Sequence, residues 1–368
     1  MWIRGAARQS HDMTITRSMT KPPTTMAGAD PEGLGGVEFH RVTRVLSNHR
    51  WWRPILVAAV AATIYAAAFL LAMVLLAIAG IVFPGVERVM DTFLREADVM
   101  DLSDPFMFAF AMGMLILLLP ALLLATRMVG AGPVGLLSSV VGRIRLRWLA
   151  LCGLAAITIY AVAYVTQFLV AVAQGQSLAP TLDMPRAAVA VVLTLALVPL
   201  QAAAEEYVFR GYLMQTIGGW LRHPAFAILL PVPLFVLGHD YGLLGMTDVA
   251  AFAIAAGWLT WRTGGLEAAV ALHVVGNVSG FALAAVGLMD INATEFGAGS
   301  LVISLLLTLS FTVVVVRLST GCCIQRTAPL TTDPAGITPA TAARTSRRKE
   351  LLARRLEGRV RTGRDAQG

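Results

Sequence analysis

The segment AAVAVVLTLALVPLQAAAEEYVFRGYLMQTI, residues 187–217, joins a long apolar run to three charged side chains. Its first part is long and apolar enough to cross a bilayer as a helix. Glu205, Glu206 and Arg210 follow inside the same predicted helix. An ionised carboxylate in hydrocarbon is costly unless it is paired, hydrated or protonated. We therefore interpret this segment as a membrane helix that carries functional polar groups.

The composition of the whole chain agrees with a membrane protein. The 368 residues are 57% hydrophobic and 14% charged, whereas soluble domains are about 25% charged. Inside lipid the backbone must satisfy its own hydrogen bonds, which favours helices. The sequence predicts an all-α polytopic membrane protein with about eight transmembrane helices and the polar site inside the bundle.

The apolar runs also predict the division of the chain. The eight spans are expected at about residues 54–83, 105–125, 148–173, 187–217, 225–239, 249–261, 266–289 and 301–318. We predict a disordered N-terminal tail at 1–50, a transmembrane domain at 51–318 with a motif-bearing core at 187–289, and a flexible basic tail at 319–368.

The distribution of charge predicts orientation and partners. Arginines precede the first span and fill the loop at 127–147, and the loops at 87–104 and 290–295 are acidic. Because positive loops stay in the cytoplasm, we expect both termini there, in the plasma membrane of a bacterial cell. The tail at 319–368 carries ten basic and four acidic residues. It favours anionic lipids as a partner; no nucleic-acid partner is expected, since the rest of the chain offers no basic groove.

Few ionisable residues lie inside the spans. Glu206 and Arg210 are four residues apart and can form an ion pair on one helix face. Glu205 is rotated by about 100°, and we expect it to lie beside His239, facing a cavity. We expect no partner for it four residues on, where Phe209 lies, and none four residues back, since Gln201 is neutral.

Helix geometry places three of these groups at one depth. If the fourth helix continues to residue 217, Glu205 is ~18 Å from its end, at 1.5 Å per residue. By the same count His239 is ~21 Å and His273 ~16 Å from the same side. Asn277 follows His273 by four residues and shares its helix face.

One carboxylate, two imidazoles and one carboxamide at one depth could support hydrolysis. Glu205 can take a proton from water, which His239 can hold, and His273 and Asn277 can donate hydrogen bonds to an oxyanion. The alternative is a zinc site, with Glu205, His239 and His273 as ligands and one open position. The residues leave both chemistries open.

Three motifs carry a family resemblance. Glu205-Glu206-x-x-x-Arg210, Phe235-x-x-x-His239 and His273-x-x-x-Asn277 resemble the motifs of the CPBP intramembrane proteases, which include CaaX-prenyl endopeptidases and bacteriocin-processing proteins. The resemblance covers about residues 187–289.

The resemblance implies an eight-helix membrane core. It also implies that Glu205 and His239 activate water, that His273 and Asn277 hold the oxyanion, and that Glu206 and Arg210 support the site. It leaves a metal-dependent and a metal-free mechanism open.

Two functions follow from these observations. The first is an intramembrane endopeptidase acting on a peptide or protein substrate within or at the membrane. The alternative is a non-enzymatic scaffold or immunity factor, or a transporter, that uses the polar cluster for binding. A transporter is expected to show internal repeats, and the sequence shows no convincing one.

Overall fold

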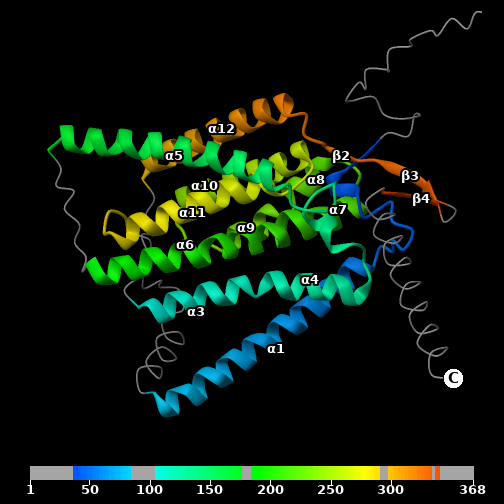
Figure 1. Ribbon diagram of the computed structural model, residues 1–368, viewed down its shortest axis with the longest axis horizontal. Helices are drawn as coiled ribbons and strands as arrows, with labels where there is room; N and C mark the ends of the chain where they lie inside the picture. The colour runs from blue at the N-terminus through cyan, green and yellow to red at the C-terminus, as the bar shows by residue number, and fades with distance from the viewer. Residues whose placement is uncertain (1–35, 84–103, 176–183, 291–296, 334–335, 340–368) are drawn as a thin grey trace, which may run out of the picture. The chain divides into compact units, whose positions relative to one another are not determined.

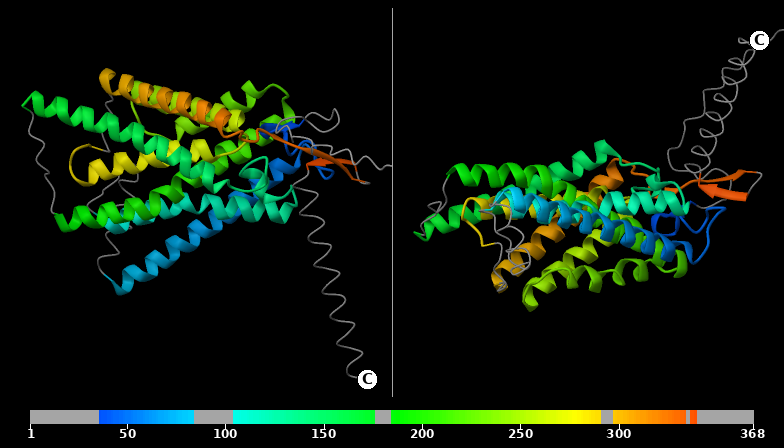
Figure 2. Two further views of the ribbon diagram at one scale, coloured as in Figure 1. Left: turned by 45° about the horizontal axis from the view of Figure 1, so that its top comes forward. Right: turned by 90° about the horizontal axis from the view of Figure 1, so that it is seen from below.

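The computed structural model describes residues 36–83, 104–175, 184–290, 297–333 and 336–339. Helices dominate this part of the chain (Figures 1 and 2). Their bounds are α1 (Arg53–Val82), α3 (Pro105–Ile116), α4 (Leu118–Val129), α5 (Leu146–Ala173), α6 (Met184–Glu206), α7 (Met214–Trp220), α8 (Pro224–Leu229), α9 (Val232–Leu237), α10 (Leu243–Thr263), α11 (Glu267–Ala285) and α12 (Ala298–Gly321). The irregular helices are η2 (Phe39–Arg41), η3 (Val134–Leu137) and the π-helical η4 (Tyr207–Leu213).

The long helices confirm the predicted fold class. Within the described residues, seven helical stretches are long and apolar enough to cross a membrane, and Pro224–Leu237 is a shorter apolar stretch. The longest is continuous from Pro185 to Trp220 through α6, η4 and α7. The fourth helix therefore extends past Arg210, as the depth argument requires, and the polar residues lie in its interior.

The helices within Gly35–Gly368 lie side by side (Figure 1). Helix α11 packs against α6, α5 and α10, so it occupies the middle of the bundle. Helix α12 packs on α5 and α10, α3 on α6, and α1 on α4. The site residues of α6 and α11 therefore lie at the most extensive helix–helix contact of the bundle.

The predicted fifth span differs from the structure. Instead of one helix to residue 239, two short helices form, α8 and α9, and they end at Leu237. Pro231 and Pro233 lie at this break, and proline removes a backbone donor and clashes with the preceding turn. The stretch is about 21 Å long at 1.5 Å per residue, which is short of a bilayer core of about 30 Å. His239 therefore follows a helix end.

The described parts of the predicted tails also differ from expectation. Strand β1 (Val37–Glu38) pairs antiparallel with β2 (Thr327–Ala328), and Phe39, His40 and Val42 are fully buried. Gly218 in α7 permits this packing, because a side chain there would collide with the carbonyl of His40.

Residues 36–50 thus belong to the folded body. Strand β3 (Leu330–Asp333) pairs antiparallel with β4 (Gly336–Pro339). The part of the basic tail at 340–368 that we expect to meet anionic lipids lies outside the described residues.

Candidate active site

Helix α6 brings the two carboxylates into the bundle. Its apolar residues favour a membrane helix, and Pro199 lies inside it, six residues before Glu205. The chain then changes to π-helix over Tyr207–Leu213, which includes Arg210. Single π-helical turns are rare and occur frequently at functional sites. Proline and the π-helical turn flank the site on the same helix.

Glu206 and Arg210 form the ion pair that their spacing predicts. Arg210 Nη1 lies 2.8 Å from Glu206 Oε1, with side-chain exposures of 4% and 0%. Arg210 Nη2 also donates to the carbonyl of Ala253 on α10 at 3.3 Å, and its guanidinium carbon lies 4.4 Å from the centre of the Phe235 ring. Arg210 is thus held by α6, α9 and α10 together.

His273 lies between the two carboxylates. Its Nδ1 is 2.7 Å from Glu206 Oε1, and its Nε2 is 3.6 Å from Glu205 Oε2. Because a carboxylate only accepts hydrogen bonds, Nδ1 is the donor in the shorter contact. Nε2 is the ring nitrogen that faces Glu205, and in the neutral ring with its proton on Nδ1, Nε2 carries no proton. The sequence predicted neither contact, and both result from the packing of α11 on α6.

Glu205 has a partner that the sequence analysis excluded. Gln201 Nε2 donates to Glu205 Oε1 at 2.6 Å, and Asn277 Nδ2 donates to Gln201 Oε1 at 3.3 Å. The expectation of no partner four residues back was wrong, because only charged partners were considered. The signal was present, since side chains at i and i+4 on a helix meet. Glu205 Oε2 has no hydrogen-bond partner among the described residues.

Among the described residues, His239 forms no hydrogen bond or ion pair with this network. Its Nδ1 lies 2.8 Å from the carbonyl of Phe235, and its ring centre is 4.9 Å from that of Phe235. The expectation that it lies beside Glu205 finds no support in its contacts. No group of three His, Cys, Asp or Glu side chains among the described residues could hold a metal ion. Glu205, His239 and His273 are therefore not gathered as a set of metal ligands in this structure, and the zinc site considered above stays a prediction.

Aromatic rings close the site toward α9 and α10. The ring of Phe252 is 4.9 Å from that of His273, and the ring of Phe235 is 6.0 Å from it. Phe209 packs edge-on against Phe235 at 4.9 Å. These rings shield Arg210 and His273 from water, which strengthens the electrostatic interactions between them and the carboxylates.

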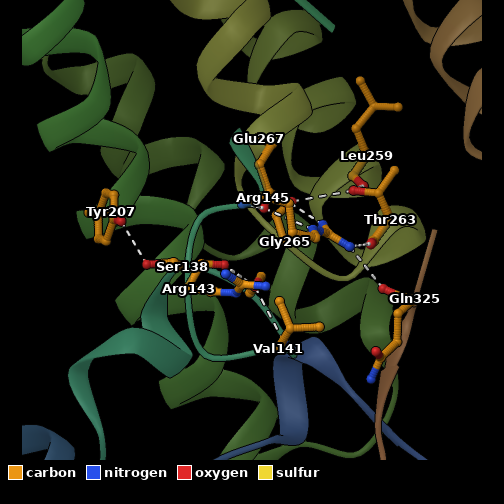
Figure 3. Close-up of polar contacts among 11 residues, drawn as sticks. Ser138, Val141, Arg143, Arg145, Tyr207, Leu259, Thr263, Gly265, Glu267 and Gln325 are labelled. Atoms are coloured by element: carbon orange, nitrogen blue, oxygen red, sulfur yellow. Dashed lines mark hydrogen bonds and ion pairs between the residues drawn. The ribbon is translucent and has the colours of Figure 1, made fainter. Parts of the chain in front are cut away.

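A second buried ion pair lies at the start of α11 (Figure 3). Arg145 Nη2 is 2.6 Å from Glu267 Oε2, and Glu267 is fully buried. Glu267 Oε1 accepts from Arg145 Nε and from the Arg145 backbone N–H, each at 2.8 Å. Arg145 Nη1 donates to the carbonyls of Thr263 and Gln325. The sequence analysis did not single out this pair, which ties the loop before α5 to α10, α11 and the C-terminal segment.

The helices and the buried Glu–His–Gln–Asn network define a polytopic membrane protein with a polar site inside its bundle. Residues 187–279 match the family model of the Rce1-like type II CAAX prenyl endopeptidases, a peptidase family. The match supports the resemblance to CPBP proteases, and it contains all six candidate site residues. Comparisons with curated proteins and with solved structures gave no match.

Proposed function

We propose that the protein is an intramembrane endopeptidase that hydrolyses a peptide bond with water activated by Glu205. The observation that carries the proposal is the difference between the two carboxylates. Glu206 is fully buried and is fixed by Arg210 and His273, whereas the hydrogen-bond donor to Glu205 is the neutral amide of Gln201 and the Glu205 side chain is 11% exposed. A carboxylate that is not paired with an arginine and that water can reach can accept a proton from water.

The other residues take supporting roles in the proposal. His273 and Asn277 hold the developing oxyanion, with Glu206 fixing the His273 ring through Nδ1. A neutral ring protonated on Nδ1 has no proton on Nε2, so His273 donates from Nε2 only as an imidazolium. Gln201 holds both Glu205 and Asn277 and thus joins the proposed base to the proposed oxyanion donor.

His239 completes the site in the proposal by holding the attacking water. Its ring contacts Phe235, whose ring also faces His273 and Arg210. Catalytic contacts are often loose without substrate, so we expect His239 to approach Glu205 when substrate binds. The substrate class is a peptide or protein at the membrane. In this proposal both termini face the cytoplasm and the protein lies in the plasma membrane of a bacterial cell.

The test compares Glu205→Gln with Glu206→Gln in the purified full-length protein. Both are assayed at equal folded concentration against a library of peptides in detergent micelles. Glu205→Gln keeps the shape but removes the base, so we expect turnover to fall roughly 100-fold or more with folding intact. Glu206→Gln should impair folding first. If Glu205→Gln keeps most of the activity and Glu206→Gln abolishes it, the two roles are reversed.

Two further arms separate the alternatives. Dialysis of the active protein against a chelator should leave turnover unchanged. If turnover is lost and added zinc restores it, the metal-dependent mechanism is the correct one. If no peptide is cut faster by the wild type than by Glu205→Gln, the cluster serves binding rather than hydrolysis.

A further inference from the structure

A pocket outside the candidate active site lies at the end of the bundle where α1 begins. Its walls come from the segment before α1, the first turn of α1, the connection from α4 to η3, and η4 with α7. These elements meet at one end of the bundle (Figure 1). Its cavity volume is about 50 Å³, room for one small group rather than for a whole ligand, and the pocket is open on one side. We call it the arginine pocket, after Arg50 and Arg53 in its lining.

The charged side chains that line the arginine pocket are all cationic. Among the described residues that line it, Arg50 and Arg53 are cationic and no Asp or Glu occurs. The two guanidinium groups bond only to carbonyl oxygens in the described chain: Arg50 to that of His49, and Arg53 to those of Asn48 and Gly130. Burial, together with the charges of Arg44, Arg50 and Arg53, lowers the pKa of His49. The arginines therefore supply the positive charge at neutral pH.

The rest of the arginine pocket lining is more apolar than polar. Leu46, Val57, Leu136 and Leu137 line it and are buried. Gln215 adds a buried amide whose Nε2 donates to the carbonyl of Leu136 at 2.7 Å. A guanidinium rim over aliphatic walls fits a molecule with an anionic head and an apolar chain.

The residues beside the arginine pocket are typical of the boundary between water and lipid. Helix α1 begins at Arg53, and its apolar run starts directly after it. Trp51 and Trp52, which precede the helix, are 65% and 43% exposed. Exposed tryptophans beside arginines are typical of the interface of a membrane. A phosphate at this depth would meet Arg50 and Arg53, and an attached acyl chain would meet the apolar walls.

We propose that the arginine pocket binds one anionic phospholipid, with its phosphate on Arg50 and Arg53 and the start of an acyl chain against Leu46, Val57 and Leu137. Basic pockets between transmembrane helices are known to bind lipid head groups of this charge. The site does not depend on the proposed peptidase activity, since none of its lining residues belongs to the candidate active site.

The test titrates the full-length protein in neutral detergent with short-chain lipids and reads bound lipid by native mass spectrometry. The probes are dioctanoyl phosphatidylglycerol, dioctanoyl phosphatidylcholine and inorganic phosphate. We expect one tightly bound phosphatidylglycerol, weaker phosphatidylcholine and no retained phosphate. Each arginine near a membrane surface contributes about fivefold in affinity. Arg50→Gln and Arg53→Gln should each weaken phosphatidylglycerol binding by about that factor, and the double variant by more.

A matched variant removes the same charge elsewhere. Arg143→Gln acts on an exposed arginine outside the pocket lining and should bind phosphatidylglycerol like the wild type. Ala131→Phe fills the pocket from its wall without changing charge and should also lose the lipid. Retained chromatographic profile and melting temperature show that each variant is folded.

Three results would overturn the proposal. They are equal affinity for the two lipids, equal loss in the matched arginine variant, and phosphate alone binding as tightly as phosphatidylglycerol. The last result would assign the pocket to a free anion.

Discussion

The protein contains two buried arginine–glutamate pairs that are satisfied to different degrees. Around Glu267, both carboxylate oxygens are used: Oε2 by Arg145 Nη2, and Oε1 by Arg145 Nε and backbone N–H (Figure 3). Around Glu206, Arg210 and His273 share Oε1, and Oε2 has no partner among the described residues. A fully bonded buried pair is typical of a structural role, whereas an incompletely bonded one needs another reason to persist.

The difference indicates that the Arg145–Glu267 pair stabilises the bundle, whereas the Glu206–Arg210 pair belongs to the candidate active site. The Arg145–Glu267 pair joins a loop to two helices and the C-terminal segment, and no other titratable side chain forms a hydrogen bond or ion pair with it in the described chain. In the Glu206–Arg210 pair, Glu206 also accepts a hydrogen bond from His273. The other ring nitrogen of His273 faces a second carboxylate, that of Glu205. The first pair should tolerate no change of geometry, and the second should retain a partner when one member is lost.

The largest expected effect is the loss of Arg145. In Arg145→Ala the fully buried Glu267 keeps only a backbone donor, so we expect a cost of about 3–5 kcal/mol in the free energy of unfolding, the range for a broken buried pair. Denaturant unfolding in detergent and the yield of monodisperse protein measure it. Arg143→Ala, at an exposed neighbouring arginine, is the control and should change stability by less than about 0.5 kcal/mol. Equal stability of the two variants would remove the structural role of the pair.

A smaller effect is expected for Arg210. In Arg210→Ala, Glu206 still accepts from His273 Nδ1, so the cost should lie near the lower end of the same range, about 3 kcal/mol. Combined with His273→Gln, the loss should exceed the sum of the single effects by about 0.5–3 kcal/mol, as for residues that share a partner. Arg145→Ala combined with His273→Gln should be additive. If Arg210→Ala folds normally and loses only turnover, Arg210 is not a stabilising residue.

The smallest expected effect concerns a buried base outside the membrane helices. His40 is fully buried; its Nε2 donates to the carbonyl of Arg222, and Nδ1 has no hydrogen-bond partner. Burial lowers the pKa of His40 below 6.5, although Arg222 and the Glu38 carboxylate oppose this. The unfolded chain therefore takes up the proton first as pH falls. Stability should be complete above about pH 6.5 and decrease below it.

Thermal unfolding between pH 7.5 and 5.5 measures this decrease. His40→Gln keeps a donor for the Arg222 carbonyl but has no titrating ring, so its profile should be flatter than that of the wild type. A wild-type melting temperature that rises on acidification would contradict the sign.

Patterns within single segments of the sequence predicted most of the helices and the Glu206–Arg210 ion pair of the site. The spans of α1, α3–α4, α5, α10 and α12 follow from apolar runs alone, and the Glu206–Arg210 pair follows from helical spacing. Pro231 and Pro233 were available as signals for the break in the fifth span, as was Gln201 as a neighbour of Glu205. The sequence analysis considered span length and charge there, and gave too little weight to proline and to neutral donors.

Other features depend on contacts between helices. The two contacts of His273 are set by how α11 is rotated against α6, and a rotation of one residue would move the ring by about 100°. The position of His239 depends on where α9 stops. The burial of Phe39 and Val42 depends on a strand from the other end of the chain. No periodicity within a single segment carries this information.

The pairing of β1 with β2 has a consequence for biogenesis. Val37 emerges from the ribosome long before its partner Ala328, by about 15–60 s at roughly 5–20 residues per second. Phe39 and Val42 must therefore wait without their final neighbours while the membrane helices are inserted. The last step of assembly is the arrival of a late strand at an early one, and it closes the bundle after translation has passed the final helix.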